Sequence, residues 1–345
     1  MKPLAWLLIL TGVYAMILVS ITVFNWLGPD RFWLGALNLY LPQVMWAVPG
    51  VVLVLLMYRV DRCGVWLPLL CVLWVFGPVM GYNWSLQLAS AEAAGSTIRV
   101  MTWNIKYGRH DLAPLLEEIE RCRPDVVFFQ DAVDAMKGPL ADYFRKWQVR
   151  GSGQYLIASR YPLSQAEVHE LPGPRMKKES FLRCRMQIGS QQVSLYNVHL
   201  KTPRSSLNAF RKAARGPRGI PEAIRRFDNN VGARLVQARS IAGLLADETG
   251  PVILAGDLNA PGASLVCRTL RDAGLQDAFA EHGRGYGYTY GHFLLKHRLP
   301  WLRTSWMRID HIMASAGFRG QRCWVGTGEA SDHRPVVAEY VLITK

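Results

Sequence analysis

The chain has 345 residues, a net charge of +14 and 50% hydrophobic residues. This length allows a membrane segment followed by one large domain. The six cysteines are scattered without a Cys-x-x-Cys spacing, which argues against a structural zinc site.

The positive charge lies almost entirely beyond residue 95. That part of the chain carries 36 of the 40 Lys and Arg residues and 23 of the 26 Asp and Glu residues, a net +13. A domain with this charge attracts polyanions such as nucleic acid, anionic lipid or phosphorylated glycans. The alternative interpretation is a general surface bias that aids solubility.

Three apolar stretches near the N-terminus predict transmembrane helices, at 4–27, 39–58 and 65–82. The first lacks a small-residue cleavage site and exceeds a signal-peptide core in length, so we predict an anchor. Charged turns at Asp30-Arg31 and Arg59 to Arg62 separate the three stretches. This separation favours three spans over one anchor followed by a buried hairpin, and defines a membrane segment at 1–84.

Basic residues predict the orientation of these spans. Lys2 precedes the first span, and Arg59 and Arg62 follow the second, whereas Arg31 after the first span sits beside Asp30. Short cytoplasmic segments are rich in Lys and Arg. We therefore expect a multi-pass protein of the inner or plasma membrane with its large domain outside the cytoplasm. With only two spans, that domain would face the cytosol.

The residues beyond the membrane segment predict one α/β domain. A small, polar linker occupies 85–97, and the domain occupies 98–345. Short apolar runs predict strands at 98–103, 126–129, 155–158, 181–186, 193–198, 252–255, 310–313 and 336–342. Helical spacing of apolar residues predicts helices at 111–122 and 232–246. Because many strands do not alternate with helices, we expect two mixed sheets packed face to face, with helices outside.

Acids, amides and imidazoles adjoin most of these strands. They form short polar groups: Thr102-Trp103-Asn104, Gln130-Asp131, Asn197-Val198-His199-Leu200, Gly256-Asp257-Leu258-Asn259-Ala260, Arg308-Ile309-Asp310-His311 and Ser331-Asp332-His333-Arg334-Pro335. Oxygen ligands suit a hard cation, and a water nucleophile requires a nearby base. The pattern predicts metal-assisted hydrolysis of a phosphate ester.

The order of these groups resembles the endonuclease/exonuclease/phosphatase superfamily over residues 98–342. That superfamily includes apurinic endonucleases, pancreatic-type deoxyribonucleases, neutral sphingomyelinases and inositol-polyphosphate 5-phosphatases. The resemblance implies a four-layer sandwich of two mixed β-sheets flanked by helices, here preceded by transmembrane helices. It also implies hydrolysis of phosphate esters with Mg²⁺ or Mn²⁺.

The resemblance implies metal-site positions at Asn104, Asp131 and Asp332. Asp131 stands where the family carries a glutamate, and its side chain is one methylene shorter. The cation must therefore shift, bind through a water or bind more weakly. The alternative interpretation of Asp131 is a cap for a helix at 132–136.

The resemblance also implies catalytic residues. His199 would contact the scissile phosphate, and Asp257 and Asn259 would orient the attacking water and hold a phosphoryl oxygen. Asp310 would orient His333, which would act as a general base or stabilise the phosphate. An Asx-type turn is the alternative for Asp257 and Asn259, and His311 is expected to be a surface or packing residue.

Substrate binding is expected at two further sets of residues. Tyr155 and Arg160 match a tyrosine and a turn on the substrate side of the family. The segment 201–227 is rich in basic residues and in Gly and Pro, which predicts a basic loop that includes Arg211, Lys212, Arg215 and Arg218. The segment 286–306 mixes aromatic and basic residues. Both segments fit nucleic acid or anionic lipid headgroups; a solvated loop and a partly buried aromatic cluster are the alternative.

The leading expectation is a nuclease acting on nucleic acid or another polyanionic phosphodiester. A sphingomyelinase-like phospholipid phosphodiesterase, or an inositol- or sugar-phosphate phosphatase, comes second. A degenerate protein that only binds polyanions is the alternative outside enzymes, and the aspartate at position 131 is the feature that supports it. No protein partner is predicted.

Overall fold

The computed structural model describes residues 2–85, 97–108, 112–133, 135–173, 179–213, 216–291 and 304–343. The chain divides into two compact units. One consists of Met1–Asn83 with Ala263–Leu265, and the other of Trp84–Gly262 with Val266–Lys345. Most of the segment predicted as a linker lies outside the described residues.

The N-terminal unit is helical. Its α-helices are α1 (Lys2–Leu27), α2 (Trp33–Tyr40), α3 (Ala47–Val60) and α4 (Trp66–Trp74). Short 3-10 helices occupy Pro29–Arg31, Gln43–Trp46 and Arg62–Val65, and a π-helical turn occupies Val75–Val79. Helices α1, α3 and the α4 segment share a small core in which Leu18, Met57 and Val75 are fully buried.

Three helical segments of this unit are long and apolar enough to cross a membrane: Pro3–Leu27, Gln43–Val60 and Arg62–Val79. Only 22%, 28% and 22% of the residues in their most apolar stretches are buried within the protein, so most of their apolar side chains are exposed. The second segment starts later than predicted, because Leu39 and Tyr40 end the separate helix α2 before Pro42. The third starts earlier, because the turn at Arg62–Val65 is itself helical.

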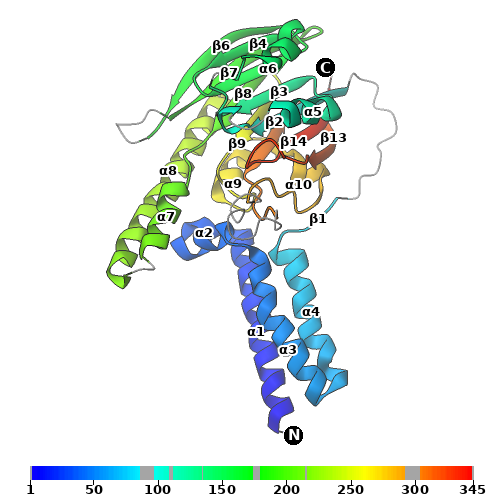
Figure 1. The fold of residues 1–345 in the computed structure, drawn as a ribbon, viewed down its shortest axis with the longest axis vertical. Helices are drawn as coiled ribbons and strands as arrows, with labels where there is room; N and C mark the ends of the chain where they lie inside the picture. Colours follow the sequence, from blue (N-terminus) through cyan, green and yellow to red (C-terminus); the bar gives the residue numbers. More distant parts are fainter. Residues whose placement is uncertain are drawn as a thin grey trace. The chain divides into compact units, whose positions relative to one another are not determined.

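The second unit contains two six-stranded mixed sheets (Figure 1). The first sheet has the strand order β10-β12-β9-β8-β7-β6, and the second has the order β13-β14-β2-β3-β5-β4. The strands of the first sheet are β6 (Leu163–Leu171), β7 (Glu179–Ile188), β8 (Gln191–His199), β9 (Val252–Asp257), β10 (Leu275–Asp277) and β12 (Asp310–Ser315). Those of the second are β2 (Thr97–Asn104), β3 (Val126–Gln130), β4 (Gln148–Ser152), β5 (Tyr155–Ser159), β13 (Phe318–Val325) and β14 (Val336–Leu342). Two-residue strands lie at Asn83–Trp84 and Arg284–Gly285.

Alternate side chains of the strands divide among three apolar cores, because successive residues of a strand face opposite sides of its sheet. Val100, Phe128 and Ile253 are among those buried between the two sheets. The outer face of the first sheet packs on helices α8 (Ile220–Ala246) and α9 (Leu265–Asp272). The outer face of the second sheet packs on α5 (Leu112–Cys122) and α6 (Pro139–Tyr143). This is the predicted four-layer sandwich.

All eight predicted strands are confirmed, and the helix predicted at 111–122 forms from Leu112 onward. The predicted basic loop at 201–227 is wrong. Helix α7 spans Arg204–Ala213, a short 3-10 turn spans Pro217–Gly219, and α8 already begins at Ile220. Pro221 falls in the first turn of α8, where a missing backbone N–H costs nothing. Glu222 then accepts hydrogen bonds from Arg225 and Arg226, one turn further along the helix.

A buried polar network supports the start of β12. Arg308 donates hydrogen bonds to both carboxylate oxygens of Asp277, at 2.8 and 2.9 Å. His311 contacts the same carboxylate through Nδ1 at 3.3 Å and donates from Nε2 to the Ala260 carbonyl at 2.9 Å. Asp277 and His311 are completely buried. The network therefore ties the segment that follows β9 to the segment that carries Asp310, and identifies His311 as a packing residue.

We expect Asp277→Asn to destabilise the fold by about 3–5 kcal/mol, because Arg308 would keep its buried charge without a carboxylate partner. Denaturant unfolding of the full chain in detergent measures this loss. Asp272→Asn, the same substitution at an exposed position at the end of α9, is the control and should change stability by less than about 0.5 kcal/mol. Equal stability of the two variants would contradict the role assigned to the network.

Candidate functional site

The polar groups of the sequence meet at one edge of the two sheets. β2 and β3 run parallel, with Asn104 opposite Gln130, and β8 and β9 run parallel, with His199 opposite Asp257. Parallel strands end at the same edge of a sheet. β12 runs antiparallel to β9, so its first residue, Asp310, also lies opposite Asp257. The topology alone therefore brings these side chains together.

Gly256 makes the approach of β9 to β8 possible. Its φ of 150° is a conformation that side-chain-bearing residues rarely adopt, and a Cβ at this position would lie 1.8 Å from the Val198 carbonyl oxygen. Only glycine fits here without displacing backbone. The close approach sets Asp257 directly beside His199.

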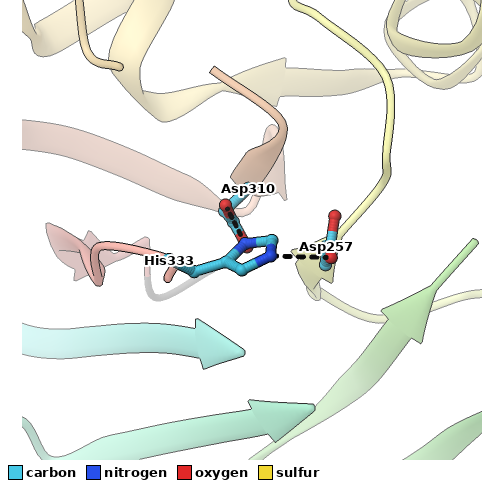
Figure 2. Close-up of side chains that lie close together, drawn as sticks. All are labelled: Asp257, Asp310 and His333. Atoms are coloured by element: carbon cyan, nitrogen blue, oxygen red, sulfur yellow. Dashed lines mark hydrogen bonds and ion pairs between the residues drawn. The ribbon is translucent and has the colours of Figure 1, made fainter. Parts of the chain in front are cut away.

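Asp257, Asp310 and His333 form the centre of the site (Figure 2). His333 Nδ1 lies 2.9 Å from one carboxylate oxygen of Asp310 and 3.1 Å from the other. The other ring nitrogen, Nε2, lies 3.7 Å from Asp257 Oδ2. Both aspartates are 1% exposed and His333 is 4% exposed. The imidazole is thus held between two buried carboxylates.

These interactions shift the proton affinities of the group. Burial lowers the pKa of His333, but the carboxylates of Asp310 and Asp257 outweigh burial and raise it to about 9. Burial and the neighbouring Asp310 raise the pKa of Asp257, against the opposing effect of His333 and His199. In the metal-free protein His333 therefore carries a proton at neutral pH.

Asn104, Asp131 and His199 complete the inner site. Asn104 Nδ2 donates to Asp257 Oδ2 at 3.1 Å. His199 Nε2 lies 3.5 Å from the same oxygen, and its Nδ1 lies 3.6 Å from Asp131 Oδ1. Of the helix predicted at 132–136, the described residues 132, 133, 135 and 136 are not helical, which does not support the alternative interpretation of Asp131 as a helix cap.

Asp257 and Asn259 form the Asx-type turn that was their alternative interpretation, and Asp332 makes an ion pair that the sequence did not predict. Asn259 donates from Nδ2 to the Leu200 carbonyl at 3.0 Å, and its backbone N–H donates to Asp257 Oδ1 at 2.9 Å. Asn259 thus fixes the turn after β9 and the carboxylate of Asp257. Asp332 Oδ2 lies 2.6 Å from Lys106 Nζ.

The two predicted substrate-side residues lie at opposite ends of β5. Tyr155 accepts a hydrogen bond from Gln154 Nε2 at 3.0 Å, and Gln154 Oε1 lies 3.0 Å from His199 Nδ1, so Tyr155 borders the site. Arg160 follows the far end of the strand, where it stacks over Trp147 at 4.5 Å and lies 3.8 Å from Asp125. The structure does not bring Arg160 to the site.

The predicted basic residues lie on the helical segment after His199. Arg211 and Lys212 are exposed in the last turn of α7, and Arg218 is exposed in the 3-10 turn that follows. Arg215 lies outside the described residues. For the residues that the structure describes, the inner interactions of the site involve none of these basic side chains.

Sequence reasoning missed Lys106 and Gln154, whereas Arg204 and Tyr290 lie in the two segments that were expected to bind substrate. The ring of Tyr290 lies 4.7 Å from that of His333, and its hydroxyl is hydrogen-bonded to Arg204. Lys106 was detectable as the first cation after Asn104, and Arg204 as a cation shortly after His199. Gln154 lies in a turn without any such signal.

The donor set of the site fits a divalent cation. One ligand atom each from Asp257, Asp310 and His333 lies within 4.8 Å of the others. Carboxylate oxygens and imidazole nitrogens are ligand types that Mg²⁺ and Mn²⁺ sites use. Asn104 contacts Asp257 directly, whereas Asp131 faces His199 and Asp332 faces Lys106.

Several solved structures share this fold. An endonuclease/exonuclease/phosphatase from Bacteroides vulgatus is 17% identical and covers 72% of this chain and 100% of its own, with a TM-score of 0.55. A family protein from Bacteroides thetaiotaomicron is 14% identical and covers 73% and 100%, with a TM-score of 0.52. D. rerio TDP2, complexed with a single-strand DNA product, is 18% identical and covers 71% and 99%, with a TM-score of 0.50.

No curated protein matches the chain significantly. Residues 101–333, more than half of the chain, match the sequence model of the Endonuclease/Exonuclease/phosphatase family. Together with the four-layer fold and the cluster of acids and histidines at its edge, this match shows that the chain belongs to the endonuclease/exonuclease/phosphatase family.

Proposed function

We propose that this protein is a divalent-metal-dependent hydrolase of phosphate esters that acts on nucleic acid. The observation that carries the proposal is the buried Asp257–Asp310–His333 group, joined by His199 and Asn104 at the ends of strands from both sheets. Members of the family are phosphoester hydrolases, which supports the reaction class. A bound Mg²⁺ or Mn²⁺ would polarise the phosphoryl group and lower the pKa of a bound water.

The protein's own residues would divide the acid and base work. Asp310 holds the His333 ring through Nδ1, which leaves Nε2 facing Asp257 and the reacting group. With Nδ1 held by Asp310, His333 would exchange a proton with the reacting group through Nε2. Asp257, beside both histidines, would orient the attacking water. His199 would contact the phosphate from the other side of Asp257.

Nucleic acid is favoured as the substrate by charge. The residues beyond position 95 carry a net +13, and Arg211, Lys212 and Arg218 are exposed on the helical segment that follows His199. A similar solved structure, TDP2, holds a single-strand DNA product. The membrane-type helices favour a second candidate, a phospholipid phosphodiesterase, whose substrate would lie at the same membrane.

We further propose that the three apolar helices anchor the protein in the inner or plasma membrane, with the catalytic domain on the outer side. Three spans place the two ends of the chain on opposite sides of the bilayer. Lys2, Arg59 and Arg62 then share the cytoplasmic side, where basic residues concentrate.

We expect His333→Ala to lower turnover on the order of a hundredfold or more, as loss of a general acid–base residue does. The assay incubates the full chain in detergent with Mg²⁺ or Mn²⁺ and DNA, RNA, sphingomyelin or inositol phosphates. His169→Ala, which changes a histidine of the edge strand β6, is the control and should keep its activity. Full activity of His333→Ala, or of the wild type in a chelator, would exclude the proposed mechanism.

Nucleic-acid binding should weaken steeply with salt, because neutralising phosphates releases counterions. Replacing Arg211, Lys212, Arg215 and Arg218 with glutamine should weaken DNA binding and reduce the salt slope by about one for each phosphate that is no longer neutralised. The double variant Arg319→Gln/Arg322→Gln, on the edge strand β13, is the control. It measures how much DNA affinity falls for each positive charge removed from a different part of the surface. An unchanged slope, together with efficient cleavage of choline or inositol phospholipids, would favour the second candidate.

A reporter joined after Lys345 tests the orientation. Alkaline phosphatase folds to an active enzyme outside the cytoplasm, so we expect that fusion to be active. If the alkaline phosphatase fusion is inactive and a fusion to a reporter that fluoresces only in the cytosol is fluorescent, the domain lies in the cytosol instead.

A further inference from the structure

Lys106 contacts the site, although it is not among the residues expected to bind a metal ion. Its ammonium group lies 2.6 Å from Asp332 Oδ2, and Asp332 directly precedes His333. The Asp332 side chain is 10% exposed, whereas that of Lys106 is 38% exposed. Lys106 is thus a partly exposed cation bound to a largely buried carboxylate beside His333.

The turn that carries Lys106 has an unusual backbone conformation. Lys106 and Tyr107 have φ values of 48° and 64°, so two consecutive residues other than glycine adopt the left-handed conformation. Such strain persists only where surrounding interactions enforce it, and it concentrates at functional sites.

Residues of the site itself enforce this conformation. The Lys106 backbone N–H donates to Asn104 Oδ1 at 3.1 Å, and the Tyr107 N–H donates to the Asp131 carbonyl at 2.5 Å. Ser331 Oγ donates to the Asn104 carbonyl at 2.7 Å, which ties the Asp332–His333 loop to the same strand end. These contacts fix the backbone of Lys106 relative to the loop that carries His333, and the Lys106 ammonium group contacts Asp332 in that loop.

The negative charge of the site indicates a function for Lys106. Asp257 and Asp310 contact His333, and Asp332 directly precedes it, so three carboxylates lie at or next to the residues that would bind a phosphate. A phosphate needs cations there besides any metal ion, and an ammonium group has three donors, of which Asp332 takes one. Arg204 lies near enough to Asp332 and Asp131 to interact with both charges, so a second cation borders the same opening.

We propose that Lys106 is a catalytic residue that donates hydrogen bonds to a phosphoryl oxygen of the substrate, and that Asp332 is the positioning residue that holds it there. This inference rests on the proposed function. In this proposal the main function of Asp332 is to hold Lys106, and the metal ion is bound by the group around Asp257. Lys106 would stabilise the negative charge that develops on the phosphoryl oxygens in the transition state.

The test compares Lys106→Met with the conservative Lys106→Arg in the full chain in detergent. Lys146→Met, the same change in the 3-10 turn Phe144–Lys146, is the control. Three quantities are measured for each variant: the affinity for inorganic phosphate, the affinity for Mn²⁺ by electron paramagnetic resonance, and kcat and KM for the substrate that the wild type cleaves. Phosphate affinity should fall at least tenfold in Lys106→Met and recover partly in Lys106→Arg, while Mn²⁺ affinity stays within a few-fold of the wild-type value.

Asp332→Asn and Asp257→Asn separate positioning from metal binding. Asp332→Asn should weaken phosphate binding while Mn²⁺ binding changes little, and Asp257→Asn should weaken Mn²⁺ binding. The inference is overturned if the wild type does not bind phosphate, or if Lys106→Met binds it as the wild type does. It is also overturned if Lys106→Met gains Mn²⁺ affinity strongly, because Lys106 would then only occupy a metal position.

Phosphate and Mn²⁺ binding are measured without turnover, so they report on Lys106 independently of the substrate. A wild type that cleaves none of the esters but binds phosphate through Lys106 would refute the proposed function and the catalytic role of Lys106, and would leave only its phosphate-binding role.

Discussion

The fold depends on a buried amide that joins the two sheets. Asn197 of β8 donates from Nδ2 to the carbonyls of Phe129 and Leu156 in the opposite sheet, both at 3.0 Å, and accepts from Gln130 Nε2 at 2.7 Å. Asn197 and Gln130 are completely inaccessible to water. An unpaired buried amide costs far more than a paired one contributes, so the sheets pack stably only in the arrangement that satisfies Asn197. That arrangement sets Asp131, next to Gln130, against His199, two residues after Asn197.

The chemistry of the site follows from this joining of sheets. Asn104 and Asp131 come from the second sheet, whereas His199, Asp257 and Asp310 come from the first. Each sheet alone would leave carboxylates or imidazoles without partners. Packed together, they bury two aspartates around one imidazole, and burial makes their electrostatic interactions strong. The packing of the core and the electrostatic interactions within the site therefore depend on the same contact between the two sheets.

The sequence predicted the central strands and missed the edges. The four strands it did not show, β4, β6, β10 and β13, are the outermost strands of the two sheets. An edge strand such as β6 is largely exposed, so it lacks the apolar pattern of a central strand. The predicted basic loop at 201–227 failed because Gly and Pro were weighed without their position in a helix. Strand-end acids and histidines were predictable, whereas Lys106 and Gln154 act from turns whose geometry depends on tertiary interactions.

The position of β14 in the sequence and in its sheet determines at what stage of synthesis the site can form. β14 lies between β13 and β2, inside its sheet, yet it is the last of the described strands to be synthesised. Arg334 and Pro335 separate His333 from its first residue, Val336, and the indole of Trp103 donates to the His333 carbonyl at 2.9 Å. A partly made chain lacks both the central strand and the imidazole. Until β14 and His333 have been synthesised, Asp257 and Asp310 therefore lack the imidazole that joins them, and the site is incomplete.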